Sequence, residues 1–376
     1  MRVFFSAGEA SGDALGAALI EALKLQDPAL EAYGMGGPRM AAAGCRIEQD
    51  AGELNVMGLV EVLRHLPRLF RLRDRVVQLA LQNRPDVAVL IDVPDFNVRV
   101  AKRLKAAGIK VAFYVGPSVW AWRPGRVERY RRVLDRLLVL FPFEAPIWAR
   151  AGVDVVCVGH PMLDEIPAPA AGALIRPKTV ALLPGSRRGE IERHFPIMLE
   201  AAQRLLAGGQ AERFVVPVAP TLDVEWLRGF VARAGLLDRV ELVEDRDGPL
   251  RRAAVAASEL ALVVSGTATL ETALLGRPQI IFYRANWLSY WVYRLMVTLT
   301  HVGLPNIIAG REVAPELLQG KLTGESLAAA AGHLLEDPEA KAAAVQATVE
   351  IRERLGPPGG AARAADAVRA LVARDG

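Results

Sequence analysis

Segments of strand and helix character alternate along most of this chain, and this alternation constrains its fold more than any other feature. In the first 160 residues, short apolar runs predict strands at residues 2–6, 31–34, 86–91, 110–115, 136–140 and 153–158. A second series predicts strands at residues 179–183, 213–217, 240–243, 260–264 and 279–283. Runs that are apolar at every position are typical of parallel strands buried on both faces. The sequence therefore predicts an α/β protein with two doubly wound, Rossmann-like domains.

A proline-rich segment separates the two series. Residues 166–178 contain three prolines in thirteen positions, which interrupts both the strand and the helix period and predicts a linker. We therefore expect an N-terminal domain over residues 1–165 and a C-terminal domain over residues 179–345. The last residues, 346–376, are rich in alanine and are expected to form a helical tail.

The chain is apolar for a protein without a predicted membrane span. Its mean hydropathy is +0.22, yet its most apolar stretch, residues 287–300, is only 14 residues long and includes Arg294. A membrane-spanning helix needs about 20 apolar residues, and the N-terminus lacks the long apolar core of a secretory signal. We therefore expect the chain to remain in the cytoplasm.

Cysteine, histidine and charge exclude several classes of protein. Cys45 and Cys157 are isolated, and the five histidines are not at metal-ligand spacing. We therefore expect neither a disulfide framework nor a metal site. The net charge of +4 is mild, and no nucleic-acid partner is expected.

Loops of the second series have the composition of a phosphate site. Ligands of doubly wound sheets bind beyond the carboxyl ends of the strands. Gly185, Ser186 and Arg187 follow one predicted strand, and a glycine, a hydroxyl and a guanidinium at that position suit a phosphate. Gly266 and Thr267 begin a predicted helix after another strand and offer backbone N–H groups to an anion. Further candidates in the same half are Glu271, Arg284 and Asn306.

Glu271 has two interpretations. Its carboxylate can bind a ribose diol, or it can simply interact favourably with the N-terminal end of its own helix. Arg284 ends the strand at 279–283 and is a second phosphate candidate, and Asn306 lies in a polar loop.

Two carboxylates end the most apolar strand of the first series. Asp92 leaves the strand directly, whereas Asp95 follows Pro94 at the start of a predicted helix, where Asp is a favourable N-cap. Both are candidates for a general base. Asp92 is the stronger candidate, because no structural role such as helix capping explains an aspartate at its position.

A glycine-containing turn follows the first strand. Its sequence, GEASGD at residues 8–13, suits the approach of a ligand to the backbone and to a helix N-terminus. It does not match the GxGxxG pattern, which argues against a dinucleotide site. The candidate residues in this turn are Gly8, Glu9, Ser11, Gly12 and Asp13.

Two segments have features of a membrane surface. Arg64, Arg68 and Arg71 share one face of a predicted helix, which indicates either a membrane-facing basic helix or an ordinary solvated face. Trp287 and Trp291 lie in a short aromatic segment that suits a bilayer interface or an acyl-chain groove, or else a buried helix between domains.

Ten motifs in this order resemble those of the lipid-A-disaccharide synthase family, and they extend over about residues 3 to 320. They are GEASGD (8–13), GPRM with GC (37–45), VMGLVEVL (56–63), IDVPDFN (91–97), PSVWAWR (117–123), PFE (142–144), VGHPM (158–162), LPGSRRGE (183–190), SGTATLE (265–271) and LPNIIAGRE (304–312).

The resemblance implies an inverting glycosyltransferase of the GT-B type, with two domains facing a cleft. Such an enzyme transfers 2,3-diacylglucosamine from UDP to the 6-hydroxyl of 2,3-diacylglucosamine 1-phosphate, and releases UDP. The resemblance also implies that no metal or other cofactor is needed and that the enzyme lies on the inner face of the cytoplasmic membrane. Asp92 is then the expected base, supported by Asp95, and Arg187 and Arg284, with helix N-termini, stabilise the departing UDP.

The remaining candidates divide between the two substrates. The UDP-sugar side comprises Gly185, Ser186, Arg187, Gly266, Thr267, Glu271, Arg284 and Asn306. The GEASGD turn and the arginine face would serve the acceptor and the membrane. Three alternatives stay open: a GT-B-type enzyme of soluble substrates such as a UDP-N-acetylglucosamine 2-epimerase, a non-catalytic lipid- or nucleotide-binding protein, and a lipid glycosyltransferase with another substrate.

Overall fold

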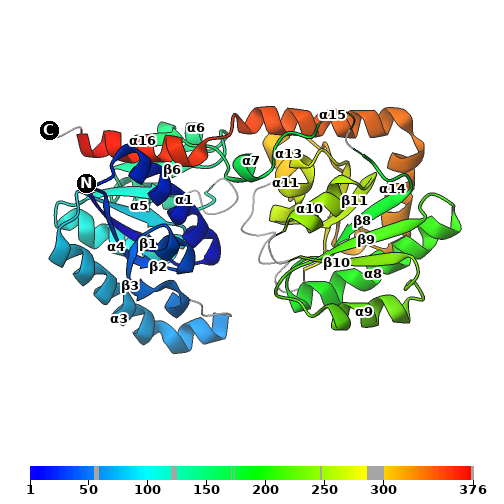
Figure 1. The fold of residues 1–376 in the computed structure, drawn as a ribbon, viewed down its shortest axis with the longest axis horizontal. Coiled ribbons are helices and arrows are strands. Elements are labelled where there is room, and N and C mark those ends of the chain that lie inside the picture. The colour runs from blue at the N-terminus through cyan, green and yellow to red at the C-terminus, as the bar shows by residue number, and fades with distance from the viewer. Residues whose placement is uncertain are drawn as a thin grey trace. The chain divides into compact units, whose positions relative to one another are not determined.

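The computed structural model describes residues 1–54, 59–119, 125–170, 172, 174–245, 248–285 and 300–373, without the side chains of residues 59–66. The chain divides into two compact units, drawn in Figure 1. The first unit combines Met1–Asp164 with Pro357–Gly376, and the second is Glu165–Gly356. Residues of the predicted linker, where described, form neither helix nor strand and belong to the second unit.

The first unit is built on a seven-stranded parallel sheet in the order β3-β2-β1-β4-β5-β6-β7. Its strands are β1 (Arg2–Ala7), β2 (Glu31–Gly36), β3 (Arg46–Asp50), β4 (Val87–Ile91), β5 (Lys110–Tyr114), β6 (Arg136–Val139) and β7 (Val155–Cys157). The chain builds outward from β1 to β3 and then returns to β4 on the other side of β1. The neighbours β1 and β4 therefore form the switch point of the sheet, where ligands bind in this architecture.

Helices cover both faces of this sheet. They are α1 (Ala10–Gln26), α2 (Pro38–Ala42), α3 (Leu59–Asn83), α4 (Pro94–Ala106), α5 (Arg126–Arg131), α6 (Ala145–Arg150), α7 (Met162–Glu165) and α16 (Gly360–Ala373), with a 3-10 turn at Ala51–Leu54. Side chains of α1 and α16 pack on alternate residues of β1 and β4, and α3 and α4 pack on the other residues of the same strands. The C-terminal helix α16 thus lies beside the N-terminal helix α1, as Figure 1 shows.

The second unit has a six-stranded parallel sheet in the order β10-β9-β8-β11-β12-β13. Its strands are β8 (Thr179–Leu183), β9 (Arg213–Val218), β10 (Val240–Glu244), β11 (Leu260–Val264), β12 (Gln279–Tyr283) and β13 (Glu316–Leu318). Its helices are α8 (Arg188–Ala207), α9 (Val224–Arg233), α10 (Pro249–Ala256), α11 (Thr267–Leu274), α13 (Leu304–Ala309), α14 (Gly324–Glu336) and α15 (Pro338–Leu355), with a 3-10 turn at Gln319–Lys321. The switch point here lies between β8 and β11.

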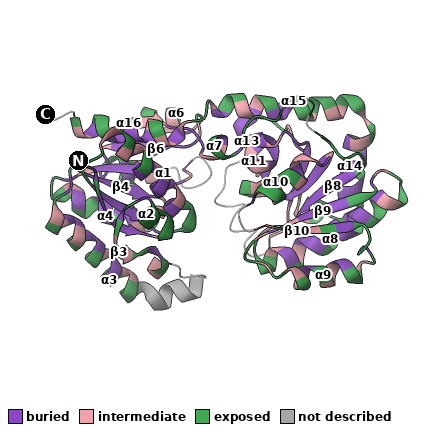
Figure 2. Ribbon diagram, in the orientation of Figure 1, coloured by how far each residue is buried: buried purple, intermediate pink, exposed green. Residues whose placement is uncertain are grey.

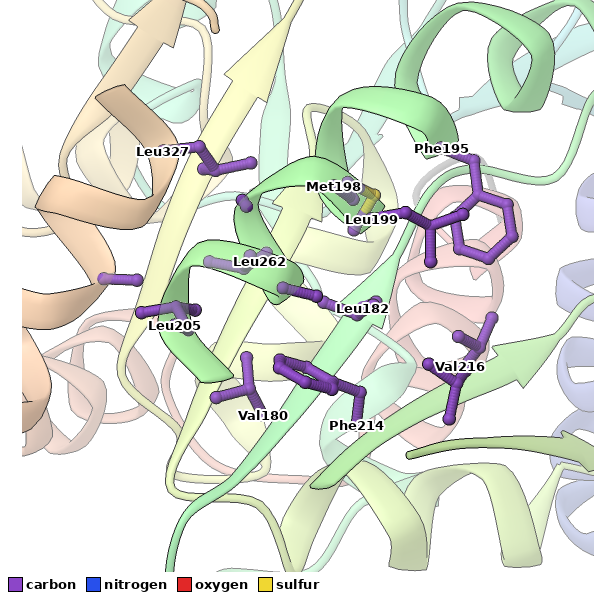
Figure 3. Packing of buried hydrophobic residues seen from close by; sticks show 14 of the residues in the cluster. Val180, Leu182, Phe195, Met198, Leu199, Leu205, Phe214, Val216, Leu262 and Leu327 are labelled. Atoms are coloured by element: carbon purple, nitrogen blue, oxygen red, sulfur yellow. The ribbon is translucent and has the colours of Figure 1, made fainter. Parts of the chain in front are cut away.

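The central strands are buried along their whole length, as the uninterrupted apolar runs predicted. Every residue of β4, β8 and β11 is buried. Figure 2 shows the central strands of both sheets in purple beneath helices that are exposed on their outer faces, whereas edge strands such as β3 and β10 are partly exposed. In the second unit, Phe195 and Met198 of α8 belong to one buried cluster with Leu182 and Phe214 of the sheet, which Figure 3 draws. The prediction of two doubly wound parallel-sheet domains is therefore confirmed.

The predicted helical tail is divided between the two units. Residues 346–355 complete α15 in the second unit, and α16 belongs to the first unit. Among the described residues, no helix combines the length and the apolar character needed to cross a membrane.

Candidate active site

A pocket of about 480 Å³ lies at the carboxyl ends of β8 and β11 in the second unit. We refer to it as the strand-end pocket. It is lined by Leu183, Pro184, Gly185, Ser186, Arg187, Glu190, Pro217, Ala219, Gly248, Arg251, Arg252, Val255, Val264, Ser265, Gly266, Thr267, Ala268, Glu271, Thr272 and Leu275. Six of the eight residues predicted for the UDP-sugar are in this lining, namely Gly185, Ser186, Arg187, Gly266, Thr267 and Glu271.

The backbone at the pocket is arranged to receive an anion. Gly185 has a φ of +109°, and a Cβ atom at this position would lie 2.6 Å from Oε2 of Glu190. Helix α11 begins at Thr267, and no side chain caps its N-terminus. The N–H of Thr269 donates to the Gly266 carbonyl at 3.1 Å, so the N–H groups of Thr267 and Ala268 and the positive end of the helix dipole are the groups offered to a phosphate.

Charged side chains line the same pocket. The Arg187 side chain is 80% exposed, and its only hydrogen bond within the described residues is a long one of 3.4 Å to Glu190. Its guanidinium is therefore available to a bound anion. Glu190 also accepts the N–H of Ser186 at 3.3 Å, so this carboxylate holds the turn.

Glu271 is held by an arginine that the sequence analysis missed. Arg252 of α10 donates from Nε to Glu271 at 2.9 Å and from Nη2 to Glu165 at 2.6 Å. Arg251 also lines the pocket and donates to the carbonyl of Val218 at 3.3 Å. Neither arginine stands out in the sequence, because both lie in a helix where exposed arginines are ordinary.

Two of the predicted residues lie outside the lining of the strand-end pocket. The main-chain N–H of Arg284 donates to Nε2 of His194 at 3.0 Å, and its guanidinium bonds the carbonyl of Leu322. His194 is buried, which lowers the pKa of its imidazole and keeps it in the neutral form that accepts this bond.

Asn306 is fully buried. Its Nδ2 donates to the Ala314 carbonyl at 2.7 Å and to Glu316 at 2.8 Å, while its Oδ1 accepts the N–H groups of Val313 and Ala314. These bonds fix the connection between α13 and β13, a structural role that the sequence analysis did not foresee.

In the first unit, Asp92 lies in a strained turn at the end of β4. Asp92 and Val93 have φ values of +52° and +42°, a region that costs about 1–3 kcal/mol for each residue other than glycine. The register of β1 against β4 pairs Ala7 with Ile91, so the GEASGD turn and the Asp92 turn leave the sheet side by side. Gly8 is required here, because a Cβ atom would lie 2.6 Å from Cγ2 of Val93.

The environments of the two aspartates differ. Both oxygens of Asp95 bond Nη2 of Arg126, at 2.8 and 3.0 Å, and the side chain is 63% exposed. Asp92 accepts the N–H of Val93 on Oδ1 at 2.8 Å, and its Oδ2 lies 3.5 Å from Oγ of Ser11. Within the part of the chain that the structure describes, Oδ2 of Asp92 has this one weak contact and so retains lone pairs for a substrate proton. The carboxylate of Asp95, in contrast, is held by a guanidinium.

The remaining residues of the GEASGD turn have separate roles. Glu9 is the exposed N-cap residue of α1, and Gly12 is buried in that helix. Asp13 is buried and accepts the main-chain N–H groups of Gly37, Arg39 and Met40 at 2.8, 2.9 and 3.1 Å. Both its oxygens are thus engaged at the N-terminus of α2.

We expect Asp13→Ala to lower the melting temperature of the first unit by roughly 2–8 °C, because it removes helix-capping bonds worth about 1–2 kcal/mol. Calorimetry of the intact chain measures this loss. Glu21→Ala, an exposed carboxylate on the same helix, is the control and should leave the transition in place. An equal melting temperature for both variants would contradict the assigned role.

The predicted membrane residues are described only in part. Arg68 and Arg71 are exposed on α3, with Arg68 4.0 Å from Glu53 and Nε of Arg71 3.4 Å from the Pro67 carbonyl. The side chain of Arg64 and the segment with Trp287 and Trp291 lie outside the described residues. Within the described part of the chain, no group of three or more His, Cys, Asp or Glu side chains is placed to hold a metal ion.

Two doubly wound parallel-sheet units are the architecture of the GT-B class of α/β proteins. Solved structures with this fold match over nearly the whole chain. The UDP complex of MnaA from S. aureus has a TM-score of 0.63 at 14% identity, with 98% of this chain and 96% of the other covered. MurG from Acinetobacter baumannii has a TM-score of 0.61 at 14% identity, with 98% and 99% covered.

Sequence comparison gives the family. The model of the lipid-A-disaccharide synthetase family matches residues 3–365. The lipid-A-disaccharide synthase of Myxococcus xanthus is 43% identical over 379 residues, which cover 99% of this chain and 97% of that protein. The chain belongs to the lipid-A-disaccharide synthase family, and it is an enzyme of the glycosyltransferase class.

Proposed function

We propose that this chain transfers 2,3-diacylglucosamine from UDP-2,3-diacylglucosamine to the 6-hydroxyl of 2,3-diacylglucosamine 1-phosphate. The products are the β-1,6-linked disaccharide 1-phosphate and UDP. The observation that carries the proposal for this chain is the strand-end pocket, which joins an exposed arginine, an uncapped helix N-terminus and a carboxylate in a volume of about 480 Å³. These are the groups that a nucleoside diphosphate requires.

On the donor side, Arg187 and the N–H groups at Thr267 bind the diphosphate. Negative charge grows on this group as the glycosidic bond breaks, so donors already in place stabilise the transition state more than the ground state. Glu271 accepts the ribose hydroxyls, and Arg252 orients its carboxylate. Gly185 and Ser186 supply the turn against which the phosphate lies.

On the acceptor side, Asp92 is the general base. The acceptor hydroxyl attacks the anomeric carbon from the side opposite to UDP, the anomeric configuration inverts, and Asp92 takes the hydroxyl proton. The long contact of Asp92 Oδ2 to Ser11 supports this assignment over Asp95, whose carboxylate is bound by Arg126. Asp95 then acts by ordering the first turn of α4.

Both substrates carry acyl chains, so the enzyme works at a bilayer. We place it on the inner face of the cytoplasmic membrane, with Arg68 and Arg71 of α3 facing anionic headgroups. Each basic residue near such a surface contributes about 1 kcal/mol of attraction.

The double variant Arg68→Glu, Arg71→Glu is expected to bind vesicles containing anionic lipid about 30-fold or more weakly, because two attractive charges become repulsive. Sedimentation with vesicles at low ionic strength measures this binding. Added salt should weaken the binding of the parent chain to the vesicles. Arg150→Glu, on the exposed surface of α6, is the control. Equal binding by the double variant and the control would place the membrane contact elsewhere.

The reaction itself is tested by mixing the enzyme with both acylated sugars and identifying the products by mass spectrometry. We expect the disaccharide 1-phosphate and an equal amount of UDP. Non-acylated UDP-N-acetylglucosamine is the comparison substrate. Turnover of that sugar alone, without disaccharide formation from the lipids, would favour an epimerase-type activity and reject the proposal.

A further inference from the structure

The turn that carries Asp92 is held by a buried amide. Asn97, in the first turns of α4, is fully buried, and its Nδ2 donates to the carbonyl oxygens of Asp92 at 2.8 Å and Ile91 at 3.1 Å. The carbonyl of Ser6, on β1, lies 3.3 Å from the same nitrogen. Because only a donor can face three carbonyl oxygens, the orientation of the amide is fixed.

The other end of the amide is fixed as well. Oδ1 of Asn97 accepts the hydroxyl proton of Ser6 at 2.8 Å, in a site without solvent exposure for either residue. Strand β1 thereby contacts the Asp92 turn through a side chain of α4. The three elements that meet at the switch point of the sheet are linked by this one amide.

These bonds coincide with the strained part of the backbone. Asp92 and Val93 have left-handed φ values, which are rare for a residue with a side chain and especially for a β-branched valine. Such a conformation persists only where the surrounding structure determines it. The bonds of Asn97 to the carbonyls of Ile91 and Asp92 are contacts of this kind. Without them the turn can relax, and the Asp92 carboxylate would leave its place at the end of β4.

We propose that Asn97, oriented by Ser6, is the positioning residue of the Asp92 carboxylate and thereby sets the rate of proton removal from the acceptor hydroxyl. Asn97 is buried and acts only through the turn. The inference rests on the proposed role of Asp92 as general base. A displacement of about 1 Å in a reacting group costs on the order of 100-fold in rate.

The test is a cycle of four proteins: the parent chain, Asp92→Asn, Asn97→Ser and the double variant. Product formation from both acylated sugars is measured in single turnovers, and UDP affinity by calorimetry. We expect Asn97→Ser to lower kcat about 100-fold while KM and UDP affinity are retained. We also expect the double variant to be no slower than Asp92→Asn, because a positioning residue has nothing to act on once the base is absent.

Asn83→Ser is the matched control. Asn83 is an asparagine of α3 whose Nδ2 donates to the carbonyl of Leu79 at 2.9 Å, and its replacement should leave kcat unchanged. Ser6→Ala removes only the bond that orients the amide. It should cause a smaller loss of kcat than Asn97→Ser. When Ser6→Ala is combined with Asp92→Asn, we expect no loss of kcat beyond that of Asp92→Asn alone.

Two results would overturn the inference. One is a parental kcat for Asn97→Ser. The other is a double variant whose fold-loss of kcat equals the product of the two single fold-losses, which is the result that a purely structural role for Asn97 predicts. Parental turnover by Asp92→Asn would instead reject the proposed base. The two failures are therefore distinguishable. Asn97 lies in the first unit, so a melting curve of each variant that resolves this unit separates loss of fold from loss of positioning.

Discussion

Asp92→Asn is expected to lower kcat by about 10³-fold, within the range that a general base contributes. The amide keeps the shape of the carboxylate but cannot accept the proton of the acceptor hydroxyl. UDP affinity should be unchanged, because the residues of the strand-end pocket all belong to the second unit. Single-turnover formation of the disaccharide, with calorimetric binding of UDP, measures both quantities.

Asp95→Asn separates the two candidate bases. Its carboxylate is exposed and paired with Arg126, and exposed pairs contribute only about 0–1 kcal/mol. We therefore expect most of kcat to survive in this variant. A larger loss for Asp95→Asn than for Asp92→Asn would assign the base to Asp95 instead.

Arg187→Ala is expected to lower kcat by about 10²–10³-fold, the usual effect of removing a preorganised group that stabilises developing negative charge. UDP affinity should fall as well, because the diphosphate loses a bidentate donor. Among the described residues, the exposed Arg187 side chain has only its weak contact to Glu190 to lose, so the melting temperature should be retained. Initial rates, UDP calorimetry and a melting curve together measure the effect.

Arg188→Ala is the matched control for this variant. Arg188 is the next residue, is also exposed, and lies 4.9 Å from the ring centroid of Trp226 outside the pocket lining. It should retain parental kcat and UDP affinity. If both variants lost activity equally, the effect would come from the net charge of the loop rather than from contact of Arg187 with the diphosphate.

The central part of the fold could be predicted because buried parallel strands are apolar at every position. The strands β4, β8 and β11 were identified in this way. Two edge strands were missed. The exposure of β3 alternates along its length, and β13 has only three residues, so neither has an uninterrupted apolar run.

Helices α4 and α8 begin within the motifs that carry the candidate site, at Pro94 and Arg188. Their first turns hold charged or polar residues, so the sequence shows no apolar periodicity there.

The sequence predicts the positions of Arg187 and Asp92, because each lies in the turn after a buried strand. It does not show the contacts that a polar residue makes with a part of the chain distant in sequence. Asp13 caps a helix that begins 25 residues later, and Asn306 bonds residues of the next loop. Arg252 was missed for the same reason, since its partner Glu271 lies on another helix.

The return of α16 to the first unit has a consequence for synthesis of the chain. Arg136 donates to the carbonyl of Ala367, Lys110 to that of Leu371, and Arg363 to that of Val158. These partners of β5 and β6 are therefore translated after the whole of the second unit. On the ribosome, the second unit, an uninterrupted segment from Glu165 to Gly356, can complete its core while the first still exposes the apolar surface that α16 covers. The unit made first is thus finished last.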